Sequence, residues 1–173
     1  MELYKKFVTE TLNEKGTLVD IKYHYPDNYN FAFDIVDWYG QNEPDRKAMI
    51  WVSNEDDEKI FTFADIMKES AKTAHYLRSM GIKKGDKVLV VLRRHYEWWF
   101  VMMALCKIGA IVIPATDQLK EHDFVYRFNA AGVSAIICTA TGNVIGEAES
   151  AADKCNVNIR IIRSEERRVG KEC

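Results

Sequence analysis

The sequence predicts an α/β fold in which amino-terminal helices and a hairpin are followed by a βαβαβαβ unit with a parallel sheet. Hydrophobic residues make up 47% of the 173 residues, which is enough apolar material for a packed core. Val88–Leu92 is a continuous apolar run, typical of a strand buried on both faces of a parallel sheet. From Lys87 onward, short β-rich runs alternate with helical segments, as in α/β proteins.

The first expected elements are a helix and a hairpin. Apolar residues recur at helical spacing from Asn30 to about Gln41, and Glu43-Pro44-Asp45 ends this helix. Two β-rich runs, Ala48–Val52 and Lys59–Phe63, flank a polar turn. Because strand-forming runs joined by a short polar turn pair with each other, we expect a hairpin here.

A long helix should follow the hairpin. Thr62 can cap its start, with Asp65 returning the hydrogen bond as in a capping box, although Glu or Gln is usual at that position. Gly81 ends the helix. Its inner face is expected to consist of Ile66, Ser70, Thr73, Ala74, Leu77 and Met80.

The remaining residues alternate between strands and helices. Strands are expected over residues 88–92, 111–113, 134–138 and 158–162, and helices over residues 96–108, 121–131 and 144–154. Parallel strands joined by helices form right-handed crossovers, so these segments predict one parallel sheet.

Charge and cysteine usage narrow the function classes. With 24 Lys and Arg residues against 26 Asp and Glu residues, the net charge is −2, so no basic field attracts a nucleic acid or an anionic membrane. No apolar run approaches the length of about 18 residues that a membrane span needs, and the start lacks the apolar stretch of a signal peptide. We therefore expect a cytoplasmic protein without nucleic-acid partners or stable membrane insertion. The four cysteines contain no Cys-x-x-Cys pair, so neither a metal site nor a disulfide framework is indicated.

Catalytic residues cannot be assigned from the sequence pattern. Neither a Gly-x-Gly-x-x-Gly turn after a strand nor a P-loop is present, and no histidine has a triad-like context. Arg93 and Arg94 follow the first parallel strand, at the sheet edge where α/β folds bind ligands. Two adjacent guanidiniums there can hold a phosphate or a carboxylate, but a solvated basic turn explains them as well.

Two longer motifs resemble the AMP-forming acyl-CoA synthetases of the adenylate-forming ligase superfamily. Phe61–Ile66 is similar to the early Leu-Thr-Tyr-x-Glu-Leu motif of these enzymes, and Leu105–Pro114 is similar to their second core motif. Gly81–Val88 between them resembles a shared loop and strand. Glu97-Trp98-Trp99 and Tyr29–Asp37 are similar to the medium-chain branch. The resemblance covers roughly residues 28–162.

The resemblance implies an activity and one contact residue. The family uses ATP, with Mg²⁺, to activate a carboxylic acid to an acyl-adenylate, and then transfers the acyl group to CoA. The expected acids are short- or medium-chain fatty acids or aromatic acids. Pro114–Gln118 matches a loop in which a glutamine contacts CoA, so the resemblance assigns this contact to Gln118; a solvent-facing loop glutamine is the alternative.

The resemblance also predicts that the chain is an amino-terminal fragment. The family's phosphate-gripping loop, its adenine and ribose contacts and the lysine of its carboxyl-terminal domain lie downstream of the matched segment. We therefore expect this chain alone to be inactive and to bind ATP, CoA and Mg²⁺ weakly. A rival interpretation is a stand-alone, non-catalytic α/β binding or interaction module, which a natural stop codon after Ile162 would favour.

Three segments are expected along the chain. Residues 1–27 form an amino-terminal extension and residues 28–162 a partial AMP-binding (adenylation) domain. Residues 163–173 resemble the translation of a sequencing adapter, so we interpret them as an artefactual tail.

Overall fold

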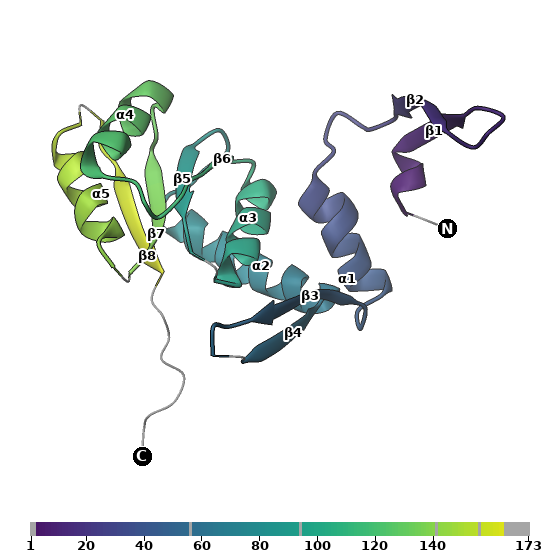
Figure 1. Cartoon of the computed structure of the whole chain (residues 1–173), viewed down its shortest axis with the longest axis horizontal. Coiled ribbons are helices and arrows are strands. Elements are labelled where there is room, and N and C mark those ends of the chain that lie inside the picture. Colours follow the sequence, from purple (N-terminus) through teal and green to yellow (C-terminus); the bar gives the residue numbers. More distant parts are fainter. Residues whose placement is uncertain (1–2, 56, 94, 141, 156, 165–173) are drawn as a thin grey trace, which may run out of the picture. The chain divides into compact units, whose positions relative to one another are not determined.

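The computed structural model describes residues 3–55, 57–93, 95–140, 142–155 and 157–164. Within it the chain forms two compact units, residues 1–67 and residues 68–173. The boundary between the two units lies within the helix α2 (Phe63–Ser79), and Figure 1 labels the elements in chain order.

The first unit begins with a short helical turn and a hairpin. The 3-10 helix η1 (Leu3–Lys6) leads into the antiparallel strands β1 (Val8–Leu12) and β2 (Leu18–Tyr23). Asn13 shapes the turn between them, since its side-chain oxygen accepts hydrogen bonds from the backbone N–H groups of Lys15 (3.0 Å) and Thr17 (2.9 Å). The sequence analysis assigned no element to this extension, so the hairpin is an addition to the predicted fold.

The predicted helix at residues 30–41 is present but unevenly wound. Ala32–Asp37 form a π-helix (η2), which continues directly into the α-helix α1 (Trp38–Asn42). Gly40 lies against the chain that follows the second hairpin, because a Cβ atom at this position would be 2.9 Å from the carbonyl oxygen of Phe63. A larger residue would force these two backbones apart.

The second hairpin and the long helix confirm the sequence-based prediction. Strands β3 (Lys47–Val52) and β4 (Glu58–Thr62) are antiparallel, and α2 (Phe63–Ser79) starts immediately after them. Asp65 Oδ2 accepts the backbone N–H of Thr62 at 2.9 Å, and the N–H of Asp65 donates to Thr62 Oγ1 at 3.2 Å. The capping box therefore forms with Asp in place of the usual Glu or Gln.

The second unit contains a four-stranded parallel sheet in the order β6-β5-β7-β8, which confirms the predicted α/β class. Its strands are β5 (Lys87–Val91), β6 (Ile111–Pro114), β7 (Ala135–Thr139) and β8 (Arg160–Ser164). Its helices are α3 (Glu97–Ile108), α4 (Glu121–Ala131) and α5 (Val144–Asp153). The last strand begins and ends two residues later than expected. It therefore includes Arg163 and Ser164, the first two residues of the segment interpreted as a tail.

The core of this unit lies on both faces of the sheet. Val88 and Val90 pack with Leu105 of α3, whereas Leu89 and Val91 pack with residues of α4 and α5, among them Phe124. All four of these strand residues are 0% exposed. This double burial explains why β5 reads as an uninterrupted apolar run rather than an alternating one.

The strand order creates a switch point in the sheet. After β5 the chain crosses to β6 on one side, and it then returns past β5 to form β7 on the other side (Figure 1). Loops that follow strands on either side of such a switch diverge from each other, which makes this edge the usual ligand position in open α/β sheets.

Candidate functional site

The candidate site lies at the carboxyl ends of β5, β6 and β7. Three loops meet this edge of the sheet: residues 92–96 after β5, residues 115–120 after β6 and the segment after β7. The first two carry the residues that the sequence analysis singled out, Arg93 and Gln118. Arg94, its other candidate, lies outside the described residues.

The loop after β5 contacts both of its neighbours. Arg93 Nε lies 2.6 Å from Asp117 Oδ2 in the loop after β6. On the other side, His95 Nε2 and Thr139 Oγ1 at the end of β7 share a hydrogen bond of 3.3 Å. Arg93 therefore pairs with a carboxylate of its own chain, a third outcome beside the ligand contact and the solvated turn considered from the sequence.

Gln118 is an exposed residue in an anchored loop. The loop starts with the backbone N–H of Ala115, which donates to the carbonyl oxygen of Val90 at 2.9 Å. It ends with Leu119, whose side chain is 7% exposed and packs in the core on the α4 side. Between these anchors the N–H of Gln118 donates to Thr116 Oγ1 at 3.3 Å, while the Gln118 residue is exposed. Its amide is thus accessible to a ligand.

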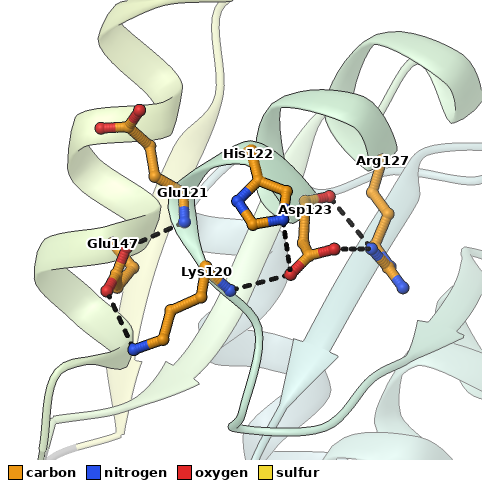
Figure 2. A network of polar contacts seen from close by, with 6 residues as sticks. All are labelled: Lys120, Glu121, His122, Asp123, Arg127 and Glu147. Carbon is orange, nitrogen blue, oxygen red and sulfur yellow. Dashed lines mark hydrogen bonds and ion pairs between the residues drawn. The ribbon is translucent and has the colours of Figure 1, made fainter.

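A polar network fixes the start of α4, directly after Gln118 (Figure 2). Glu147 of α5 accepts the backbone N–H of Glu121 at 2.8 Å and pairs with Lys120 Nζ at 3.4 Å. Asp123 accepts the backbone N–H of Lys120 at 3.1 Å. A carboxylate at the start of a helix satisfies N–H groups that have no partner within the helix. Sequence reasoning missed Glu147, since it comes from another helix and no local pattern marks it.

A second carboxylate strengthens the tie between α4 and α5. Glu121 accepts hydrogen bonds from Lys154 Nζ, at 2.5 Å, and from the Ser150 hydroxyl. The hydrogen bond from Lys154, followed by that from Ser150, lowers the pKa of Glu121. These contacts join the start of α4, which follows the loop, to the carboxyl-terminal end of α5.

The described residues of the site offer hydrogen-bond donors and acceptors for binding. Among the described residues, no three His, Cys, Asp or Glu side chains lie close enough to hold a metal ion, and Asp117 is already paired with Arg93. Cys138 on β7 is buried, and this burial raises its pKa to about 11. Its thiol is protonated at neutral pH and is a poor nucleophile.

Comparison with known proteins decides the family. A sequence profile described as AMP-binding enzyme matches residues 36–172. The chain belongs to this AMP-binding enzyme family. The two motifs that carried the resemblance lie within the match: Phe61–Ile66 spans the junction of β4 and α2, and Leu105–Pro114 joins α3 to β6. The match also covers most of residues 163–173, of which the structure describes only Arg163 and Ser164. The interpretation of this segment as a translated adapter stays a prediction, as do the segment boundaries after residues 27 and 162.

Curated relatives of this AMP-binding chain are acyl-coenzyme A synthetases. The chain is 31% identical over 166 residues to human acyl-coenzyme A synthetase ACSM3, mitochondrial, covering 91% of this chain and 28% of that protein. It is 37% identical over 118 residues to ACSM5, mitochondrial, of Rattus norvegicus, covering 65% and 20% respectively. The chain thus spans about a quarter of the length of these relatives.

Solved structures share the fold. A Brucella canis acyl-CoA synthetase superposes with a TM-score of 0.68 at 23% identity, over 86% of this chain and 26% of that chain. A Mycobacterium tuberculosis fatty acyl CoA synthetase gives a TM-score of 0.67 at 21% identity, over 78% and 26%. The described residues therefore adopt the fold of part of an acyl-CoA ligase. Within those residues, no helix has both the length and the apolar character of a membrane span.

Proposed function

We propose that this chain is part of an AMP-forming acyl-CoA ligase. The complete enzyme activates a short- or medium-chain fatty acid or an aromatic acid with ATP to an acyl-adenylate, and transfers the acyl group to CoA. The observation that carries this proposal is the family match over residues 36–172, together with 31% identity to a named acyl-coenzyme A synthetase over nine tenths of the chain.

Within that reaction we assign Gln118 to the contact with CoA. The support is its accessible amide at the carboxyl edge of the sheet, held between the buried Leu119 and the anchored Ala115. A carboxamide can donate and accept hydrogen bonds at the same time, which suits the amide groups of a pantetheine arm. A single contact of this kind orients a ligand without taking part in the chemistry.

This chain alone should not catalyse the reaction. Phosphoryl and adenylyl transfer depend on groups that clamp and neutralise the phosphates of ATP. The sequence holds no Ser/Thr/Gly-rich loop with a trailing lysine to clamp these phosphates. Tight binding of ATP, Mg²⁺ and CoA therefore requires residues beyond this segment.

The test compares two proteins: this 173-residue chain and the product of the complete open reading frame that contains it. The assay is carboxylate-dependent exchange of pyrophosphate into ATP with short, medium-chain and aromatic acids. We expect exchange with the complete product and none with the chain alone. Exchange by the chain would refute its inactivity, and no exchange by the complete product with any of these acids would refute the ligase.

The location is a separate prediction. The cytoplasm was expected from the sequence, whereas the curated relatives are named as mitochondrial proteins. Fractionation of cells that express the complete open reading frame, followed by immunoblotting, distinguishes the two compartments.

A further inference from the structure

The loop that carries Gln118 is anchored at both ends and has polar residues between these anchors. Its ends are fixed by the Ala115 hydrogen bond to β5 and by the buried side chain of Leu119. Between them, Thr116 and Gln118 are exposed; Thr116 Oγ1 accepts the N–H of Gln118 at 3.3 Å and donates to Asp117 Oδ1 at 3.5 Å. These contacts are local to the loop, so a contact from outside it would add a separate restraint at its midpoint.

Asp117 provides this midpoint anchor. Its side chain is 27% exposed, compared with 59% for that of Lys120 at the end of the loop. Asp117 Oδ2 lies 2.6 Å from Arg93 Nε. Arg93 itself is well placed to hold a loop. It follows Leu92, which is 8% exposed, and two residues later His95 is tied to the end of β7. The guanidinium thus projects from a segment fixed on both sides.

We infer that Arg93 is a positioning residue for CoA recognition, acting through Asp117 on the loop that presents Gln118. The inference rests on the proposed CoA role of Gln118. An exposed ion pair contributes little to global stability. Its effect is local, because a loop already held in its bound path loses less conformational entropy when the ligand binds. The pair should therefore affect CoA binding more than folding or adenylation.

The experiment uses the product of the complete open reading frame and the variants Arg93→Gln, Asp117→Asn and the double variant. The apparent KM for CoA is measured in thioester formation, and adenylation is measured by pyrophosphate exchange. Each single variant should raise the KM for CoA about three- to ten-fold, as the loss of one positional contact does, and the double variant should add little more. Pyrophosphate exchange should stay within about two-fold of the wild type. Arg93→Lys, which keeps the positive charge, should recover part of the loss.

Lys72→Gln is the matched control. Lys72 Nζ pairs with Glu69 Oε1 at the same distance of 2.6 Å and with similar exposure, but on α2 and outside the loop. This variant should leave the KM for CoA unchanged. An equal effect of Lys72→Gln and Arg93→Gln would overturn the inference, because any surface ion pair would then act in the same way.

Further outcomes separate the inference from the proposed function. If Gln118→Ala raises the KM for CoA but Arg93→Gln does not, the positioning role is refuted while the function stands. Additive effects in the double variant, or an equal loss in adenylation, also refute it. If the wild-type protein forms no thioester with CoA from any acid, the proposed function fails and the inference fails with it.

Discussion

The Gln118 side chain is exposed, while the residues on either side of it are half-buried or buried. Replacing it by Ala removes one or two hydrogen bonds to CoA, each worth about 0.5–1.5 kcal/mol net. In the product of the complete open reading frame we expect a higher apparent KM for CoA, with adenylation nearly unchanged. Steady-state kinetics of thioester formation and pyrophosphate exchange measure the two steps.

Gln41→Ala is the control for this substitution, since Gln41 is an exposed glutamine near the end of α1. It should change neither step. If Gln118→Ala slowed adenylation as much as thioester formation, the assigned CoA contact would be contradicted.

Cys138 gives a prediction that does not depend on catalysis. Burial raises its pKa from an ordinary value of 9.0 to about 11. At pH 8 the native thiolate fraction is therefore roughly a hundred-fold smaller than in the unfolded chain. Alkylation of Cys138 in the complete protein, followed by peptide mass spectrometry, should be at least about 100-fold slower under native conditions than in urea. Labelling at similar rates in both would mean that β7 is not buried.

The same shift predicts how stability changes with pH. Because the folded pKa of Cys138 is raised, the native state keeps a proton that the unfolded state loses above about pH 9. The stabilisation is complete below that pH and is lost as the pH rises towards 11, by up to about 1.4 kcal/mol per pH unit. Urea unfolding of the complete protein and of its Cys138→Ala variant should be measured at pH 8 and pH 10.5. The difference in their free energies of unfolding should be smaller at the higher pH. A constant difference would contradict this linkage.

Sequence reasoning worked unevenly for single residues. Thr62 and Asp65 could be predicted as a capping box because both partners lie within three positions of each other. The partnership of Arg93 with Asp117 could not, since it joins loops 24 residues apart that only the sheet brings together. Gln118 was singled out by resemblance alone, because nothing in its own composition or spacing distinguishes a ligand contact from a loop glutamine.

Among the elements, α2 offers a direct test of its start. Thr62→Ala removes the acceptor for the N–H of Asp65, and N-cap losses of this kind cost about 0.5–2 kcal/mol. A peptide covering residues 60–82 should lose helix content, measured by circular dichroism at 222 nm. Thr62→Ser keeps the hydroxyl and should retain the helix. Equal helicity of the Ala and Ser peptides would show that the cap does not contribute.

The start of α4 depends on a carboxylate from α5. Glu147→Ala leaves the backbone N–H of Glu121 without its acceptor (Figure 2), so the first turn of α4 should open more readily. Hydrogen exchange in the complete protein should become about ten- to 150-fold faster at Glu121, corresponding to a lost hydrogen bond to a charged group. Glu147→Gln keeps an acceptor and should show a smaller change. Equal exchange in all three proteins would refute this capping role.

The elements themselves and the pairing of β3 with β4 were largely predictable, but the strand order of the parallel sheet was not. β5 could be recognised because its residues are buried on both faces and are therefore all apolar. The hairpin of β1 and β2 was not predicted, although Val19, Ile21 and Tyr23 alternate with Asp20 and Lys22; all six residues of β2 are exposed, so this alternation marks no buried face. The order β6-β5-β7-β8 depends on which strands meet in space, and a single sequence does not encode that as a local signal.

At the scale of the whole molecule, the outer edge of β8 is the main liability. β8 pairs with β7 on one side, and within the described part of the chain no strand pairs with its other side. Ile161 and Ile162 lie on this strand, and open edges beside apolar residues recruit other chains. We expect residues 1–173, 1–164 and 1–162, expressed alone, to be largely insoluble or to bind a dye for exposed apolar surface.

Removing residues 165–173 should therefore not restore solubility, and the protein ending at residue 162 should be the least stable, because it also lacks Arg163 and Ser164 of the strand. Light scattering and size-exclusion chromatography measure the aggregation of the three proteins, and thermal melts measure their relative stability. A soluble, monodisperse monomer with a cooperative melt would instead support the stand-alone module.

The central place of β5 also has a consequence during synthesis on the ribosome. β6 is made soon after β5 and can cover one of its edges, but the other edge waits for β7, which begins at Ala135, about 44 residues after Val91. At roughly 5–20 residues per second, the nascent chain carries that uncovered apolar strand for roughly 2–9 s. The speed of translation between these two strands therefore sets how long a chaperone has to bind β5 before the sheet closes.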